Sequence, residues 1–230
     1  MPLKNKLEKD EVLDDLLIDG RKIIQNKNLY HFTSDSIRLA KFVKTKKSDR
    51  LVELCSGSGI IGIHLALQSE FSSLVMVEIQ KQLADMSRRS IEMNGLENKI
   101  QIINSQLQNI NKQIGTEKFD VVFCNPPFEK NDIKTENESE KIAKSEKMVN
   151  IFEICNEAGK LLKFSGSFYL CFPSTRLFEL AVALNKNNFA VKDVELVIDA
   201  KGEARLALVH AVKGGKEFCK IKLFDKAGKL

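Results

Sequence analysis

Short apolar runs alternate with segments of helical spacing through most of the chain. The runs that predict strands are Leu51–Cys55, Leu74–Ile79, Ile100–Ile103, Phe119–Cys124 and Ser167–Phe172. The segments that predict helices are Ser34–Val43, Ile60–Leu67, Lys81–Asn94, Met148–Leu162 and Leu177–Leu184. Strands that are apolar on both faces and alternate with helices are typical of a parallel sheet covered by helices on both sides.

The last part of the chain departs from this alternation. Two further apolar runs, Val191–Ile198 and Leu206–Val212, have no helix between them and predict a closing hairpin. The expected fold class is therefore α/β: a Rossmann-like, seven-stranded, mostly parallel sheet with helices on both faces and an antiparallel C-terminal hairpin. Residues 1–230 are expected to form a single domain, in which residues 1–30 are a short N-terminal lead-in.

Residues 129–147 interrupt the pattern with a charged stretch that is almost free of apolar side chains. A stretch of this composition favours a solvated, mobile loop. Because it comes soon after a predicted strand, it could also order over a substrate as a lid. The two interpretations are compatible.

The composition excludes several classes of protein. Hydrophobic residues make up 43% and charged residues 29% of the 230 residues, a balance typical of a soluble globular protein. No apolar run approaches the roughly 18 residues that cross a bilayer, and the charged start does not resemble a secretory signal. We therefore expect a cytoplasmic protein without membrane contact. The five cysteines form no close pair, which predicts neither a disulfide framework nor a metal site.

A glycine-rich segment follows the first of the predicted strands. Gly57, Gly59 and Gly62 have the G-x-G-x-x-G spacing that lets a backbone approach a ligand at a helix N-terminus. The spacing alone fits a nicotinamide dinucleotide and S-adenosylmethionine equally well. Glu53 favours S-adenosylmethionine, because a carboxylate attracts its cationic amino-acid end and repels a pyrophosphate. Glu78, at the end of the next strand, suits the two ribose hydroxyls that either cofactor carries.

Other residues complete the predicted cofactor site. Cys55 and Ser56 line the glycine loop, Cys55 as a small neighbour and not as a nucleophile. Ile79 ends the second strand. Gln106 follows the third strand, where its side-chain carbonyl could accept from an adenine amine, or where it could be an ordinary surface residue. For Glu53 the alternative is a carboxylate that caps a nearby backbone amide.

The segment Asn125-Pro126-Pro127-Phe128 directly follows the apolar run Phe119–Cys124. An exocyclic amine is a poor nucleophile, because its lone pair is delocalised into the π system. Two acceptors aimed at its hydrogens, the Asn125 carboxamide oxygen and the Pro126 carbonyl, would favour a pyramidal nitrogen with its lone pair toward an incoming methyl group. The prolines fix this geometry, and Phe128 offers a stacking surface for a flipped base. The segment therefore predicts methyl transfer to a planar NH2 group.

With these motifs, the chain resembles the class I S-adenosylmethionine-dependent N-methyltransferases over nearly its whole length. More narrowly, it resembles the bacterial tRNA1(Val) adenine-37 N6-methyltransferase family in three segments, Leu29–Ala40, Asn125–Phe128 and Glu203–Lys216. The resemblance implies that Thr33 and Asp35 lie at the cofactor pocket. Gln106 departs from the acid that is usual at its position in these enzymes.

The same resemblance implies an acceptor and a partner. It implies methylation of adenine N6 at position 37 of tRNA, beside the anticodon of valine tRNA, by a monomer. The net charge of +5 is compatible with such a partner but does not demonstrate one. The lysines expected to hold phosphates, together with lysines of residues 129–147, are Lys213, Lys216, Lys220 and Lys222.

Several alternatives share some of these features. Related enzymes with the same turn methylate a glutamine amide of release factors or guanine N2 in ribosomal RNA. The first would need a sizeable N-terminal domain, for which thirty residues are too few, and the second often carries an added RNA-binding module. A nicotinamide-dependent oxidoreductase would explain the glycines but not Asn125–Phe128. A non-catalytic RNA-binding protein that holds the cofactor is also possible.

Overall fold

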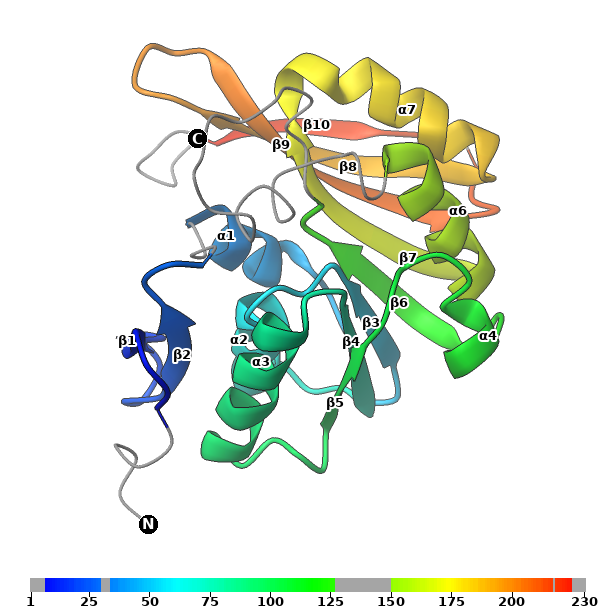
Figure 1. Cartoon of the computed structure of the whole chain (residues 1–230). Coiled ribbons are helices and arrows are strands. Elements are labelled where there is room, and N and C mark those ends of the chain that lie inside the picture. Colours follow the sequence, from blue (N-terminus) through cyan, green and yellow to red (C-terminus); the bar gives the residue numbers. More distant parts are fainter. Residues whose placement is uncertain (1–6, 30–33, 127–149, 217, 225–230) are drawn as a thin grey trace.

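A computed structural model describes residues 7–29, 34–126, 150–216 and 218–224. Its centre is a twisted sheet (Figure 1). The strands of this sheet are β3 (Arg50–Leu54), β4 (Ser73–Glu78), β5 (Ile100–Asn104), β6 (Phe119–Cys124), β7 (Leu162–Pro173), β8 (Phe189–Ile198), β9 (Ala204–Lys213) and β10 (Lys220–Phe224). Their order across the sheet is β10-β8-β9-β7-β6-β3-β4-β5.

Strands β5, β4, β3, β6 and β7 are parallel, whereas β9 runs antiparallel to both β7 and β8. The predicted Rossmann-like α/β fold with an antiparallel C-terminal hairpin is confirmed. The five parallel strands end on one side, which we call the carboxyl end of the sheet, and begin at the opposite amino end. In open α/β sheets, ligands bind beyond the carboxyl ends of the strands.

The predicted number of strands was wrong, because the sheet has eight strands within the described residues and not seven. The additional strand, β10, pairs in parallel with β8 at the edge of the sheet. Its sequence Lys-Ile-Lys-Leu-Phe was interpreted as part of a basic tail. Lysines are common on edge strands, where they discourage pairing with other chains, so a lysine-rich segment can still be a strand.

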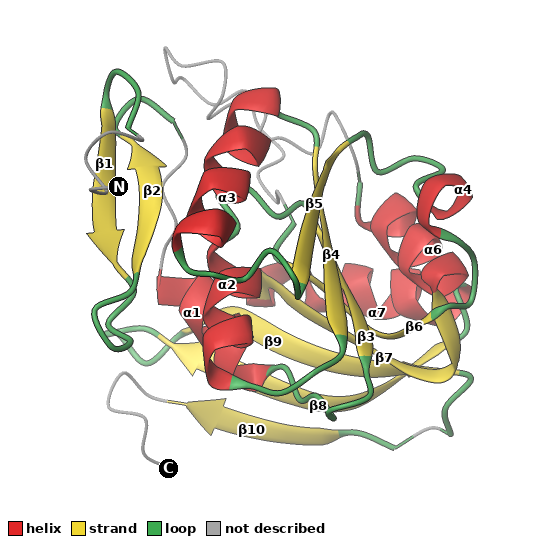
Figure 2. Ribbon diagram, turned by 90° about the horizontal axis from the view of Figure 1, so that it is seen from below, coloured by secondary structure: helices red, strands yellow, loops and turns green. Residues whose placement is uncertain are grey.

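Helices cover both faces of the sheet (Figure 2). One face carries α1 (Ser34–Phe42), α2 (Ile60–Gln68) and α3 (Lys81–Met93), and the other carries α4 (Asn111–Ile114), α6 (Ile151–Leu161) and α7 (Leu177–Lys186). A short 3-10 helix, η2 (Ser174–Arg176), joins β7 to α7. Each face has its own apolar core, centred on residues such as Leu39, Ile63 and Phe123 on the first and Ile154, Phe168 and Leu180 on the second.

The predicted helix Met148–Leu162 differs at both ends. Residues 148 and 149 lie outside the described residues. Among the residues that are described, the helix begins at Ile151. Asn150 caps it by accepting from the backbone N–H of Glu153, whose side chain accepts in return from the N–H of Asn150. Leu162 already belongs to β7, which is longer than the apolar run that predicted it.

The lead-in contains a hairpin that was not predicted, β1 (Glu11–Asp15) and β2 (Lys22–Asn26). It packs against α3, where Ile24 joins Leu83 and Met86 in a small apolar cluster. The Arg89 guanidinium forms a salt bridge of 2.5 Å with the Glu11 carboxylate. The hairpin is thus an extension of the domain on its α3 side.

Two further expectations concern the chain as a whole. All five cysteines are free thiols. Within the described ranges, no helix is long and apolar enough to cross a membrane. The charged loop at 129–147 lies outside the described residues, so its predicted role as a mobile loop or lid stays a prediction.

Candidate functional site

The glycine loop joins β3 to α2 at the carboxyl end of the sheet and depends on two left-handed glycines. Gly57 has φ +57° and Gly59 has φ +85°. A Cβ on Gly59 would lie 2.2 Å from the Ser87 hydroxyl and 2.7 Å from the Met76 methyl, whereas a Cβ on Gly57 would meet no atom within 4 Å. The loop is therefore closely packed against the protein at Gly59 and open at Gly57, where a ligand could approach.

Glu53 lies below this loop and is completely buried. Its Oε2 accepts a hydrogen bond of 3.0 Å from the Gly62 backbone N–H, and its Oε1 is buried without a partner among the described residues. Burial raises the pKa of this carboxyl well above its usual value, and the nearby Glu78 raises it further. Glu53 therefore does cap an amide, and one oxygen remains for a second donor.

Glu78 connects the glycine loop to the end of β4. Its two carboxylate oxygens accept hydrogen bonds of 2.8 Å from the backbone N–H groups of Gly57 and Gln80. Burial raises the pKa of Glu78, and these amide hydrogen bonds oppose the rise. Each carboxylate oxygen can accept more than one hydrogen bond, so ribose hydroxyls could still be bound.

The neighbouring predicted residues occupy different positions. Cys55 has a left-handed φ of 57°, which is uncommon for a residue with a side chain, and its thiol contacts that of Cys124. The Ser56 hydroxyl is buried without a partner among the described residues. Ile79 is half-buried, and Gln106 is exposed after β5.

Asn104 was not predicted, although it reinforces this region. Its side-chain amide donates hydrogen bonds of 2.9 Å to the carbonyls of Glu78 and Ile79. It is thereby placed between the ends of β4 and β5. The sequence signal for it was weak, because a polar residue at a strand end is as often a simple surface residue.

Asn125 follows β6 at the same end of the sheet, next to the glycine loop, since Cys124 is in register with Leu54 of β3. Its Nδ2 donates to the Ser36 hydroxyl of α1 over 3.4 Å, a long hydrogen bond. Its Oδ1 is buried and has no partner among the described residues. Pro126 is buried as well. The carboxamide oxygen is therefore held in place as an unused acceptor.

The first turn of α1, which supplies Ser36, is tied to β9. Asp35 accepts two hydrogen bonds from the Arg205 guanidinium, at 2.9 and 2.6 Å. This bidentate pair joins residues 170 positions apart in the chain and fixes α1 over the end of the sheet. Asp35 was predicted to bind the cofactor, but its carboxylate is engaged with Arg205, which was not predicted at all.

The four lysines predicted to bind RNA do not gather near Asn125. Lys213 ends β9 at the amino end of the sheet, where its ammonium donates to the Glu117 carboxylate at 2.8 Å and to the Leu162 carbonyl at 2.9 Å. Lys216 lies in the turn that follows. Lys220 and Lys222 belong to the edge strand β10.

Thr33 and Phe128 lie outside the described residues, so their predicted roles stay predictions. The described part of the chain brings Glu53, Glu78 and Asn125 to one end of the sheet, with an open glycine loop between them. It contains no group of three or more metal-ligating side chains close enough to hold an ion. The arrangement is suited to binding a ligand with a cationic group and a ribose beside an acceptor of hydrogen bonds.

Comparisons with known proteins identify a family. The family model described as methyltransferase small domain matches residues 34–195. A protein of Dyadobacter fermentans named tRNA1(Val) (adenine(37)-N6)-methyltransferase is 23% identical over 140 residues, which span 61% of this chain and 57% of that protein. A protein of the same name from Histophilus somni strain 129Pt is 27% identical over 198 residues, 84% of this chain and 82% of that protein.

The fold is also found among solved structures. A predicted O-methyltransferase from Agrobacterium tumefaciens superposes with a TM-score of 0.65 and 18% sequence identity, covering 82% of this chain and 85% of that one. At this identity the likeness supports the fold alone.

Proposed function

The chain belongs to the methyltransferase small domain family, and on this premise we propose that it methylates the N6 amine of adenine 37 in valine tRNA. The prediction of an S-adenosylmethionine-dependent methyltransferase is confirmed at the level of the family. The tRNA acceptor, the position of the base and the roles of individual residues belong to the proposal. The names of the two relatives support the tRNA acceptor and the position of the base.

The observation that carries the proposal is the unused acceptor on Asn125. A buried carbonyl oxygen without a donor costs free energy, about 1–3 kcal/mol, and therefore needs an explanation. An exocyclic amine that donates to this oxygen supplies the missing hydrogen bond. Because the amide nitrogen is already directed at Ser36, the oxygen is the atom presented to an acceptor base.

The described residues fit the methyl donor. The Oε1 of Glu53 is free to meet a cationic amino group, and the open side of Gly57 leaves room beside it. Glu78 is placed to receive the ribose hydroxyls. S-adenosylmethionine, when bound, supplies a methyl group on a sulfonium that departs as a neutral thioether.

The protein then contributes position more than acid or base chemistry. Asn125 Oδ1 and the Pro126 carbonyl accept from the two hydrogens of the amine, which turns the nitrogen lone pair toward the methyl carbon. Held in this way, the amine would form a carbon–nitrogen bond with the methyl group of bound S-adenosylmethionine as the carbon–sulfur bond breaks. The amine then carries a positive charge and loses one proton to water. The predicted stacking of the base on Phe128 completes the proposed geometry.

The test is a transfer assay with labelled S-adenosylmethionine and four separate acceptors: total tRNA, an unmodified valine tRNA transcript, ribosomal RNA and a release factor. We expect label in total tRNA and in the transcript, and mapping of the label to N6 of adenine 37. Label in the release factor alone would show a glutamine methyltransferase. Label in ribosomal RNA alone would show a guanine-type enzyme, and either result would overturn the tRNA proposal.

A further inference from the structure

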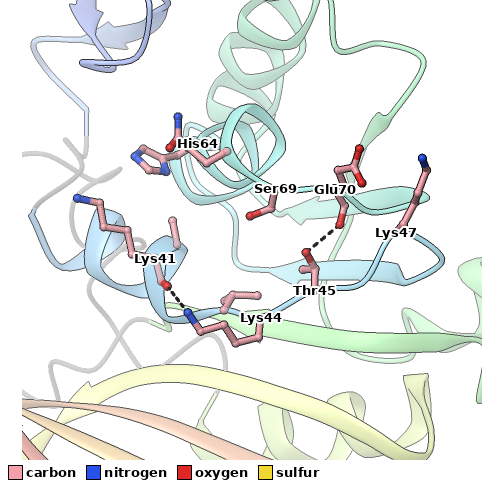
Figure 3. Close-up of a pocket in the computed structure, with 10 residues that line it drawn as sticks. Lys41, Lys44, Thr45, Lys47, His64, Ser69 and Glu70 are labelled. Carbon is pink, nitrogen blue, oxygen red and sulfur yellow. Dashed lines mark hydrogen bonds between the residues drawn. The ribbon is translucent and has the colours of Figure 1, made fainter.

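A cavity of about 450 Å³, separate from the candidate site, opens at the amino end of the sheet, where α1 and α2 end (Figure 3). It lies at the opposite end of α1 from Asn125, which contacts the first turn of that helix. The side chains that matter in its lining are those of Lys41, Lys44, Lys47, Thr45, His64 and Glu70. None of them belongs to the candidate site for methyl transfer.

His64 is the most informative of these residues. It is the fifth residue of α2, whose neighbours in sequence are almost all apolar and buried, and only 6% of its own surface is exposed. Within the described ranges no hydrogen bond joins its ring to another residue, and its ring nitrogens are not among the buried polar atoms that lack a partner, so they are open to the cavity. Its ring faces the cavity beside Lys41 (Figure 3). A ligand with acceptor oxygens in the cavity could accept a hydrogen bond from this ring.

The charge of the residues that line the cavity indicates that its ligand is an anion. Three lysines line the cavity against one acid, Glu70, whose backbone carbonyl accepts from the Thr45 hydroxyl at 2.9 Å, so the lysines outnumber the acid and the lining is basic. Burial, followed by the positive charge of Lys41, lowers the pKa of His64. A neutral imidazole next to an ammonium can donate one N–H to an anion that the ammonium attracts.

The helix ends offer a competing explanation for part of this arrangement. Both α1 and α2 end at the cavity, and cations are favourable near helix C-termini. Lys44 donates to the Lys41 carbonyl over 3.5 Å, as a capping lysine would. This explanation accounts for the lysines. It does not account for His64, which lies in the middle of α2.

We propose that this cavity binds a phosphate group of the RNA backbone, with Lys41 and His64 as its principal donors. The proposal rests on the function proposed above, because it assumes that RNA is the substrate. It adds a contact remote from the reaction, which would strengthen binding of the RNA without taking part in methyl transfer.

A neighbouring cavity favours a nucleic acid over free phosphate. It has a volume of about 330 Å³ and shares Lys44 and Thr45 with the first, so the two are adjacent. Phe164 lines it with 69% of its surface exposed, and one side of the ring lies against Gly214. An exposed aromatic ring among lysines is typical of surfaces on which an unpaired base stacks.

The acids of this second cavity are engaged within the protein. Asp120 pairs with Lys163 at 2.6 Å and also accepts from the Arg50 backbone N–H. Asp49 accepts from the Lys46 backbone N–H at 2.8 Å. The surface that remains is basic. Lys213 and Lys216, which the resemblance implicates in RNA contact, lie at this same end of the sheet.

Helix α1 connects the two sites. Its nine residues span roughly 14 Å, from Ser34 next to the Ser36–Asn125 contact to the cavity. Arg38 and Lys41 are three residues apart and therefore lie on one side of the helix. At about 3.4 Å of axis per nucleotide of a strand, roughly four nucleotides cover this distance. An RNA with its target base at Asn125 can therefore reach the cavity.

The experiment uses the full chain and the three histidines of the sequence as probes. The imidazole C–H signals are followed by NMR during titration with inorganic phosphate, with adenosine monophosphate and with unmodified valine tRNA. His64→Gln assigns the signal. We expect tRNA to shift the His64 signal, whether or not the two small phosphates shift it as well. A shift with phosphate but none with tRNA, or no shift with any of the three, would overturn the proposal.

Binding and catalysis are measured on matched variants. Lys41→Gln should raise the tRNA dissociation constant and KM roughly fivefold with unchanged kcat, and should lower the salt dependence of log Kd by about 0.7–0.9. Lys112→Gln, an exposed lysine on α4 at the other face, is the control. If wild-type protein methylates tRNA but the two variants behave alike, only this inference fails. If wild-type protein does not methylate tRNA, the proposed function fails.

Discussion

On the glycine-loop side of the candidate site, Glu53 and Glu78 accept hydrogen bonds from backbone amides, whereas on the β6 side the Asn125 oxygen accepts none within the described chain. The first side is therefore part of what holds the fold together. On the second side, Ser36 is the one described side chain that holds Asn125, and the Asn125 Oδ1 has no hydrogen-bond donor among the described residues. Changes on the first side should affect folding and cofactor binding together, whereas changes on the second should affect the methylation rate alone.

The sharpest test of this contrast is Asn125→Ala. We expect kcat for tRNA methylation to fall about a thousandfold, equivalent to roughly 4 kcal/mol of transition-state stabilisation. Thermal stability and affinity for S-adenosylmethionine should stay the same or rise slightly, because the change removes an unpaired buried acceptor. Single-turnover kinetics, thermal melting and calorimetric titration measure these three quantities. A large loss of cofactor affinity would contradict the separation of the two sides.

A pair of glycine substitutions tests the opposite side. Gly59→Ala should lower the free energy of unfolding by about 3 kcal/mol, since its Cβ would overlap the Ser87 hydroxyl and the Met76 methyl. Gly57→Ala has the same left-handed strain but open space, so about 1 kcal/mol is expected. Urea denaturation gives both values. Equal losses would show that backbone strain, and not close packing of the loop, determines the cost.

Glu53→Gln should separate stability from binding within the glycine-loop side. Glutamine keeps an oxygen to accept from Gly62 but carries no charge. Because burial raises the pKa of Glu53, the folded protein retains a proton that the unfolded chain releases, and wild-type stability falls as pH rises above the unfolded value of 4.5. The variant should therefore melt roughly 2–4 °C higher than wild type at pH 8, and the difference should vanish near pH 4.

The same variant should bind S-adenosylmethionine about tenfold to a hundredfold more weakly, because the cationic amino-acid end favours the ionised form of Glu53, which glutamine cannot adopt. Calorimetric titration at pH 8 measures this loss. Asp15→Asn, which removes an exposed carboxylate of the β1–β2 hairpin, is the control and should bind normally. Unchanged affinity in Glu53→Gln would mean that Glu53 only caps the Gly62 amide.

The sequence predicted the parts of the site that lie in contiguous segments. Glu53, Glu78 and Asn125 stand at the ends of apolar runs, and parallel strands bring their ends together whatever the side-chain details. The contacts that position these residues could not be predicted, because they join distant segments. Ser36 meets Asn125 across 89 positions and Arg205 meets Asp35 across 170. Neither pair has a local pattern, and β10 was missed because its lysines resemble those of a polar tail.

Ser36→Ala removes the long hydrogen bond between Ser36 and Asn125, and we expect it to have the smallest effect of these substitutions. Without the hydroxyl, the Asn125 amide can rotate, so its oxygen spends less time directed at the acceptor amine. Because the hydrogen bond is long, we expect kcat to fall only about fivefold, close to 1 kcal/mol, with KM for tRNA unchanged. Ser90→Ala also removes a buried serine hydroxyl, which accepts from the Ile24 N–H remote from the site, and controls for the loss of stability. If both variants lose the same activity, the backbone around Asn125 positions its amide, and the β6 side is as firmly built into the fold as the glycine loop.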